Sequence, residues 1–177
     1  HMGFRECAAY TVRNYTPTES EDALIEEWQA LSMSKYGAKD GAKYFKPRAV
    51  EFVSLLRAKG MKLCVATASA PEFYLPVLRA GGVEKLFDAF VTVEDAGKNK
   101  SFPDIFLKSA EKLAADPSEC IVFEDNLAAL LAAKKAGMQT AAVYDAQTVA
   151  QHAQLRREAD EFVETFGQMI QEINGEE

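Results

Sequence analysis

The sequence contains few cysteines and no long apolar run. No stretch of about 18 apolar residues is present that could span a membrane, and the chain opens without a secretory signal. Its three cysteines, Cys7, Cys64 and Cys120, show no C-x-x-C spacing. Cys64 and Cys120 lie in apolar runs, where a thiol usually packs as a small apolar side chain rather than acting as a ligand or nucleophile. An odd, unpatterned cysteine count is typical of a reducing compartment, so we expect a cytoplasmic protein.

Positive charge is also scarce. The chain has 20 lysines and arginines against 27 aspartates and glutamates, giving a formal net charge of −7. Nucleic acids and anionic membranes bind basic faces, so we expect neither as a partner. The length of 177 residues suits one domain, or one core domain with a small appendage.

From Pro47 onward the sequence alternates between strand and helix patterns. Helical signals, such as a proline at the start and a glycine at the end, lie between the apolar runs. Helices of this length between strands imply βαβ units, and therefore a parallel sheet with right-handed crossovers. We therefore predict an α/β fold. Its strands are expected at four short apolar runs, residues 62–66, 89–93, 120–123 and 140–144.

The segment before Pro47 differs from the rest. Residues 20–36 carry a helical pattern, and no buried strand is evident there. We predict a small helical unit over residues 3–36, a polar linker over 37–46, and the α/β core over 47–177. The apolar positions near the end of the chain are expected to pack against an edge of the sheet.

Polar residues follow each predicted strand. In an open parallel sheet, ligands bind beyond the carboxyl ends of the strands. Carboxylates hold Mg²⁺, while a lysine, a hydroxyl and backbone amides bind phosphoryl oxygens. Two adjacent carboxylates would repel each other, so the acidic pair calls for a metal or a nearby ammonium group. The residues concerned are Thr67-Ala68-Ser69, Lys98 and Lys100, Glu124-Asp125-Asn126, and Asp145.

Each of these features alone has an ordinary structural explanation. Thr67 could serve as a turn or cap residue before the helix that Pro71 opens. Asp125 and Asn126 precede a helix, where both residue types are favoured N-caps. Lys98 and Lys100 lie in a polar loop, where most lysines are simply solvated. Their order and their placement at successive strand ends favour a functional site.

Four segments of the sequence are V-A-T-A-S at 65–69, K-S-F-P-D-I-F at 100–106, V-F-E-D-N at 122–126, and A-K-K-A-G-M at 133–138. Together they resemble the haloacid dehalogenase superfamily, most closely its β-phosphoglucomutase and phosphoglycolate-phosphatase-like branch. The resemblance implies a three-layer core with a central parallel sheet, and it makes the first helices part of a helical cap. It also implies phosphomonoester hydrolysis by an aspartate nucleophile with Mg²⁺.

The resemblance assigns a role to each matched residue. Thr67, with Ala68 and Ser69, would bind the phosphoryl group. Lys100 would balance charge between nucleophile and phosphate, with Lys98 as the spare candidate. Glu124 and Asp125 would surround Mg²⁺, and Asn126 would assist through a hydrogen bond. Arg48 departs from the family pattern, because relatives commonly have glycine there.

No D-x-D motif occurs anywhere in the chain. The family carries its nucleophilic aspartate and its general acid/base in that motif, at the end of a central strand. We therefore expect these 177 residues to bind Mg²⁺ and phosphate weakly and to lack appreciable phosphatase activity. We also expect a gap between the strands at 62–66 and 120–123. Two unpaired edges favour a homodimer or an oligomer with swapped strands.

Two other functions compete with this reading. The first is a non-catalytic binding or regulatory module that keeps the phosphate pocket. The second is a receiver-like signalling domain, which also gathers acids, a threonine and a lysine at strand ends. In that fold a phosphoacceptor aspartate precedes the threonine and lysine, whereas here the acids come last, so it is the weaker alternative. A small phosphorylated metabolite is the expected ligand of the favoured reading.

Overall fold

The computed structural model describes residues 4–16, 18–36 and 41–175. Part of the predicted linker, residues 37–40, lies outside this range. The described chain alternates strands and helices from residue 49 onward, which confirms the predicted α/β fold. None of the described helices is long and apolar enough to cross a membrane.

The four predicted strands are present, each within two residues of its expected bounds. They are β1 (Cys64–Thr67), β2 (Ala89–Thr92), β3 (Ile121–Glu124) and β4 (Gln139–Val143). Every pairing among them is parallel. A fifth strand, β5 (Glu161–Val163), pairs with the outer edge of β4. The end of the chain therefore packs on a sheet edge, as expected. It does so through the strand β5, which the sequence analysis did not predict.

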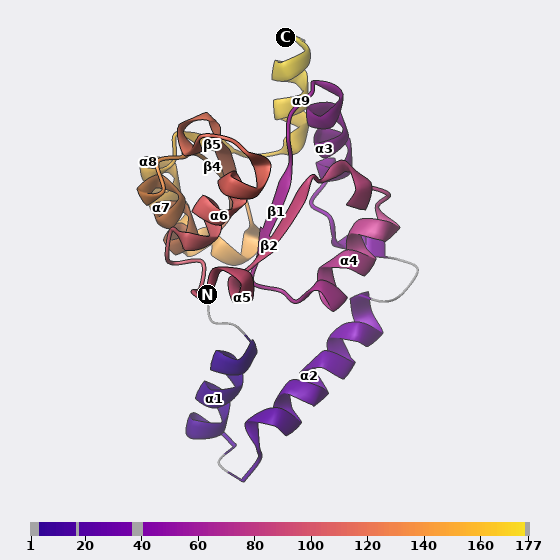
Figure 1. Cartoon of the computed structure of the whole chain (residues 1–177), viewed down its shortest axis with the longest axis vertical. Helices are drawn as coiled ribbons and strands as arrows, with labels where there is room; N and C mark the ends of the chain where they lie inside the picture. The colour runs from indigo at the N-terminus through magenta and orange to yellow at the C-terminus, as the bar shows by residue number, and fades with distance from the viewer. Residues whose placement is uncertain (1–3, 17, 37–40, 176–177) are drawn as a thin grey trace.

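The strands form two separate parallel sheets. β1 pairs with β2, and β3 pairs with β4, which in turn pairs with β5. In the described part of the chain, no strand pairs with the second edge of β1 or of β3. The separation lies where the sequence predicted a gap. Figure 1 shows the β1–β2 pair running beside the group that contains β4 and β5.

Helices pack on both faces of β3. The helix α6 (Asp104–Leu113) buries Ile105 and Phe106 in a cluster that includes Val122. Phe123 instead lies 5.3 Å, between ring centroids, from Phe52 of α3 (Ala49–Ala58). Successive side chains of a strand point to opposite faces, so β3 is covered on both sides. The same α6 cluster also contacts β1, and it thus bridges the two sheets on one face.

The remaining helices connect or flank the strands. After β1 comes α4 (Pro71–Ala80), which begins at the expected proline and continues through Pro76. The chain also has α5 (Val93–Ala96), α7 (Leu127–Lys135), α8 (His152–Glu158) and α9 (Phe166–Asn174). Short 3₁₀ turns occur at η1 (Gly41–Tyr44), η2 (Glu84–Leu86), η3 (Pro117–Glu119) and η4 (Ala146–Gln151).

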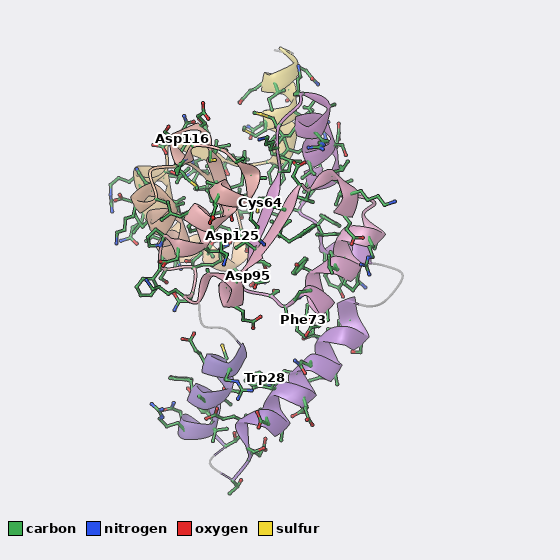
Figure 2. The ribbon with its side chains drawn as sticks, in the orientation of Figure 1. Trp28, Cys64, Phe73, Asp95, Asp116 and Asp125 are labelled. Carbon is green, nitrogen blue, oxygen red and sulfur yellow. The ribbon has the colours of Figure 1, made fainter. Side chains whose placement is uncertain are left out.

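The first part of the chain forms a pair of helices, α1 (Phe4–Asn14) and α2 (Glu21–Tyr36). Ala8 and Leu24 are buried there, and Trp28 lies between the two helices in Figure 2. This helical pair contacts the rest of the protein through α4. The predicted helical unit is thus present, whereas its standing as a separate domain remains a prediction.

Arg48 begins α3 in the left-handed region, with φ of 60°. Residues with a Cβ are strained there, and glycine is not. Glycine at this position would therefore avoid the backbone strain that arginine bears. The guanidinium of Arg48 donates to Glu51 at 2.7 and 2.8 Å, a pairing that only a long side chain can make.

Candidate functional site

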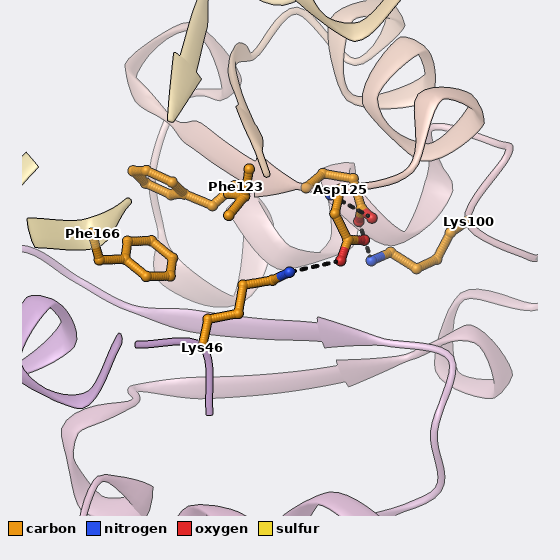
Figure 3. Close-up of a pocket in the computed structure, with 7 residues that line it drawn as sticks. Lys46, Lys100, Phe123, Asp125 and Phe166 are labelled. Atoms are coloured by element: carbon orange, nitrogen blue, oxygen red, sulfur yellow. Dashed lines mark hydrogen bonds and ion pairs between the residues drawn. The ribbon is translucent and has the colours of Figure 1, made fainter. Parts of the chain in front are cut away.

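A pocket of about 250 Å³ lies at the carboxyl ends of β3 and β4. Two lysines and two carboxylates meet apolar side chains in this pocket (Figure 3). Such a mixture of opposite charges beside an apolar wall suits a small anionic ligand or a bound cation. The lining residues are Lys46, Lys100, Phe123, Glu124, Asp125, Val143 and Phe166.

Lys100 and Glu124 form the least exposed ion pair among the described residues. The Lys100 ammonium contacts Oε2 of Glu124, and the two side chains are 15% and 8% exposed. The other oxygen of Glu124 accepts the backbone amides of Asp125 and Asn126, at 3.2 and 3.1 Å. Both oxygens of Glu124 are therefore engaged, and the carboxylate fixes the ammonium of Lys100 at the end of β3.

Asp125 has a more open and less favourable environment. Its Oδ2 atom lies 3.5 Å from the ammonium nitrogen of Lys46. Burial raises the pKa of the Asp125 carboxyl, and the neighbouring Glu124 charge raises this pKa further. A partly desolvated carboxylate with a raised pKa at a strand end is typical of functional sites.

Lys46 is the site residue that the sequence analysis missed. Its ammonium contacts the carboxylate of Asp145, the residue just after β4, and donates to the carbonyl oxygen of Tyr144 at 3.0 Å. The hydrogen bond from Lys46 lowers the pKa of Asp145. Lys46 precedes a helix rather than following a strand, so the search of strand ends could not find it.

Thr67, Ala68 and Ser69 lie at the carboxyl end of β1, as predicted, but they do not line this pocket. The hydroxyl oxygen of Thr67 accepts the backbone amide of Ser69 at 3.0 Å, which is a turn contact. The structure therefore brings together Lys100 and the acidic pair, and leaves the turn at residues 67–69 outside the lining of the pocket.

Two further candidates have structural partners of their own. Lys98 pairs with Asp104 at 3.0 Å and does not line the pocket. Asn126 caps α7, because its side-chain oxygen accepts the amides of Ala128 and Ala129 at 3.0 and 3.2 Å. The cap interpretation of Asn126 is thus confirmed.

The contacts of the acidic pair do not fit a Mg²⁺ site. Mg²⁺ requires oxygen ligands in an octahedral arrangement, yet Glu124 is fully engaged, and Asp125 and Asp145 both face Lys46. Among the side chains that the structure describes, no three His, Cys, Asp or Glu residues are grouped to hold a metal. The sequence left a metal or a nearby ammonium group as the two ways to neutralise the acidic pair. In the structure, the ammonium groups of Lys46 and Lys100 contact these carboxylates.

Thr67, Lys100 and the pair Glu124-Asp125 follow one another along the chain in the order expected from the sequence resemblance. The sequence model of the haloacid dehalogenase-like hydrolases matches residues 2–137 of this chain. The chain belongs to that family. The expected resemblance is confirmed, and the receiver-like alternative falls away.

Haloacid dehalogenase-like relatives of this chain include phosphatases. The chain is 36% identical over 123 residues to the chloroplastic protein SUPPRESSOR OF QUENCHING 1 of Arabidopsis thaliana, covering 69% of this chain and 12% of that protein. It is 33% identical over 93 residues to the phosphorylated carbohydrates phosphatase of Thermotoga maritima, covering 52% and 43%. The chain thus spans half or less of these two proteins.

The fold of this haloacid dehalogenase-like chain is that of β-phosphoglucomutase. The crystal structure of β-phosphoglucomutase from Clostridium difficile superimposes with a TM-score of 0.74 at 22% identity. The match covers 97% of this chain and 76% of the mutase. At this identity, the similarity establishes the fold and leaves the reaction open.

Proposed function

We propose that this chain is the phosphate-holding part of a phosphomonoester hydrolase or phosphomutase. We propose further that the 177 residues bind a small phosphorylated metabolite without hydrolysing it. The observation that carries this proposal is the ammonium of Lys100, held by a buried carboxylate at the end of β3. An ammonium fixed in this way can neutralise a phosphoryl oxygen without first having to be ordered.

In this proposal the phosphoryl group binds between Lys100 and the turn after β1. The hydroxyl of Thr67, whose oxygen accepts the amide of Ser69, would donate its proton to one phosphoryl oxygen beside the backbone amide of Ala68, and Lys100 would balance the charge of another. The ammonium of Lys46 lies at Asp125, where a metal would otherwise bind, so the charge of the phosphoryl group is balanced by Lys100. Since the chain holds no D-x-D motif, its own residues offer no nucleophile at the expected position.

Phosphate binding and turnover can be measured separately. We expect the protein to bind inorganic phosphate by ³¹P NMR titration and to leave para-nitrophenyl phosphate intact in Mg²⁺ buffer. Lys100→Met should abolish phosphate binding, whereas Lys98→Met should leave it within about twofold of the wild type, since Lys98 is 52% exposed and paired elsewhere. If Lys100→Met unfolds, Lys100→Gln keeps a hydrogen bond to Glu124 without the charge.

Two outcomes would overturn the proposal. Turnover that survives purification and disappears in Asp125→Ala would mean that the chain is itself an active phosphatase. Equal phosphate affinity in the Lys98 and Lys100 variants would mean that the Lys100–Glu124 pair has only a structural role. Circular dichroism of each variant separates either result from loss of folding.

A non-catalytic phosphate-binding or regulatory module is the second candidate. It is favoured by the lack of a D-x-D motif and by the pairing of every pocket carboxylate with an ammonium or a backbone amide. The coding sequence upstream of Met2 discriminates between the two. An in-frame strand followed by D-x-D-G would favour the hydrolase, and a stop codon without that motif would favour the module.

We also propose that copies of the chain associate through the free edges of β1 and β3. Each of these strands has a strand neighbour on one side only within the described residues. Unpaired backbone groups along a strand edge are a template for pairing with another chain. A homodimer, or an oligomer that exchanges strands, would satisfy both edges.

A further inference from the structure

The ammonium of Lys46 lies among three oxygen atoms at the ends of β3 and β4. One is Oδ2 of Asp125, at 3.5 Å, and another is the carbonyl oxygen of Tyr144, at 3.0 Å. The third belongs to the carboxylate of Asp145, which the ammonium contacts directly. Figure 3 shows the Lys46 side chain extending toward Asp125 from below, whereas Lys100 approaches from the right. This one ammonium therefore links the ends of two adjacent strands.

Lys46 reaches this position from a distant part of the sequence. It lies 98 and 99 residues before its partners Tyr144 and Asp145. Pro47 follows Lys46 in the sequence. The carbonyl oxygen of Lys46 accepts the backbone amide of Ala49 at 3.0 Å, in the turn that leads into α3. The backbone around Lys46 is thus tied to a helix, and the side chain is only a third exposed. The ammonium thus has partners on two strand ends and a backbone anchored to α3.

The oxygens that surround this ammonium are of the kinds that a divalent cation prefers. Carboxylate and carbonyl oxygens are the usual protein ligands of Mg²⁺ and Mn²⁺. A divalent ion bound to Asp125 and Asp145 would have to lie between them, where the Lys46 ammonium is. Two cations cannot share this space, because their repulsion is strong in a partly desolvated pocket. The ion and the lysine must therefore compete.

We propose that Lys46 is a built-in cation that takes the place of a divalent metal between Asp125 and Asp145, and thereby sets the metal affinity of the pocket. The inference rests on the proposed function only in taking this pocket as the ligand site. Its test uses neither phosphate nor turnover, so the two can fail separately. Lys46 is a positioning residue here, acting through the two carboxylates that it holds.

The test is the binding of Mn²⁺ to the free protein, followed by electron paramagnetic resonance. Lys46→Met removes the ammonium and keeps the length of the apolar stem. We expect it to bind Mn²⁺ at least about tenfold more tightly than the wild type, because the competing charge is gone. Adding Asp145→Asn to Lys46→Met should remove that gain, since one of the two carboxylates is then neutral.

A matched control separates this local effect from a change in net charge. Lys112→Met removes the same charge from an ammonium that also donates to a backbone carbonyl, that of Phe90 at 2.9 Å. Its Mn²⁺ affinity should stay within about twofold of the wild type. An equal gain in Lys46→Met and Lys112→Met, or no gain in Lys46→Met, would overturn the proposal.

A second variant guards against misfolding. Lys46→Gln can still donate a hydrogen bond to Tyr144 or Asp145, so the loop keeps its anchor when the charge is lost. We expect it to bind Mn²⁺ more tightly than the wild type and to gain thermal stability on Mn²⁺ addition, whereas the wild type gains little. A folded Lys46→Gln protein with wild-type Mn²⁺ affinity and no such thermal shift would also refute the role of Lys46.

Discussion

Glu124 holds the ammonium of Lys100 on one oxygen and two backbone amides on the other. The carboxylate thereby joins the end of β3, the start of α7 and the loop between α5 and α6. Glu124, which the sequence predicted as a metal ligand, thus positions the ammonium of Lys100 instead. The consequences can be tested by changing either partner.

Replacing Glu124 is expected to destabilise the protein. Glu124→Gln keeps an oxygen for the two backbone amides but leaves the ammonium of Lys100 without its counter-charge in a site that is only 15% exposed. We expect a loss of about 2 kcal/mol in the free energy of unfolding, measured by urea denaturation. Glu51→Gln breaks an exposed pair with Arg48 and should change little. Equal losses in both variants would contradict a special role for the buried pair.

The contact between Asp160 and Thr140 predicts a pH dependence. One carboxylate oxygen of Asp160 accepts both the amide and the hydroxyl of the buried Thr140, each at 2.8 Å. These hydrogen bonds lower the pKa of Asp160 from its ordinary value of 3.8. A lowered pKa in the folded state means that the stabilisation is present above the unfolded pKa and is lost as the pH falls through the folded pKa.

Asp160→Asn should therefore be modestly less stable than the wild type at pH 7. We expect the difference in urea midpoint to shrink as the pH falls from 3.8, the ordinary pKa of the carboxyl, through the lowered pKa of Asp160 in the folded state. The effect is modest because the Asp160 side chain is about half exposed. A difference that stays constant from pH 7 to pH 3 would show that the charge of Asp160 is not what holds Thr140.

Ala114 offers a route to higher stability. It follows α6 with φ of 48°, in the left-handed region. Glycine adopts this conformation without the steric cost that alanine bears, so Ala114→Gly should raise the free energy of unfolding by about 0.5–1 kcal/mol. Ala30→Gly, at an exposed position in the middle of α2, should lower it by about the same amount. Thermal denaturation of both variants checks the two signs together.

The sequence was sufficient to predict the strands and part of the site. Buried parallel strands are short apolar runs, so β1 to β4 could be located, and the acidic pair at 124–125 followed from its place after one of them. Three-residue β5 escaped prediction because so short a strand has no periodicity of its own. It forms by pairing with β4, and Asp160 anchors its start.

The rest of the site depends on contacts that no local pattern encodes. Lys46 meets Asp145 across 99 residues, and neither its neighbours nor its spacing indicate a partner. The pairing of Lys100 with Glu124, across 24 residues, is a second case. In both, the predicted chemistry of the carboxylates was sound, since an acidic pair needs a cation. Which cation supplies the charge was decided by the three-dimensional arrangement.

The free edges of β1 and β3 lead to a prediction about assembly. Ile121 lies at the start of β3, and its side chain is 43% exposed, which is unusual for a strand next to the centre of an α/β core. A second chain that pairs with this edge would cover that apolar side chain. We therefore expect the protein to self-associate at micromolar concentration, measured by size-exclusion chromatography with light scattering.

A lysine at this edge should oppose association, because charged side chains on an edge strand disfavour pairing with another strand. Ile121→Lys should shift the protein toward the monomer and raise the dissociation constant by about tenfold or more, since burial of an isoleucine contributes about 1.5–3 kcal/mol. Leu107→Lys, on α6 and also 43% exposed, should leave the assembly unchanged. A wild-type protein that remains monomeric at these concentrations would mean that the edges are closed in another way, and an equal effect of both lysines would place the interface elsewhere.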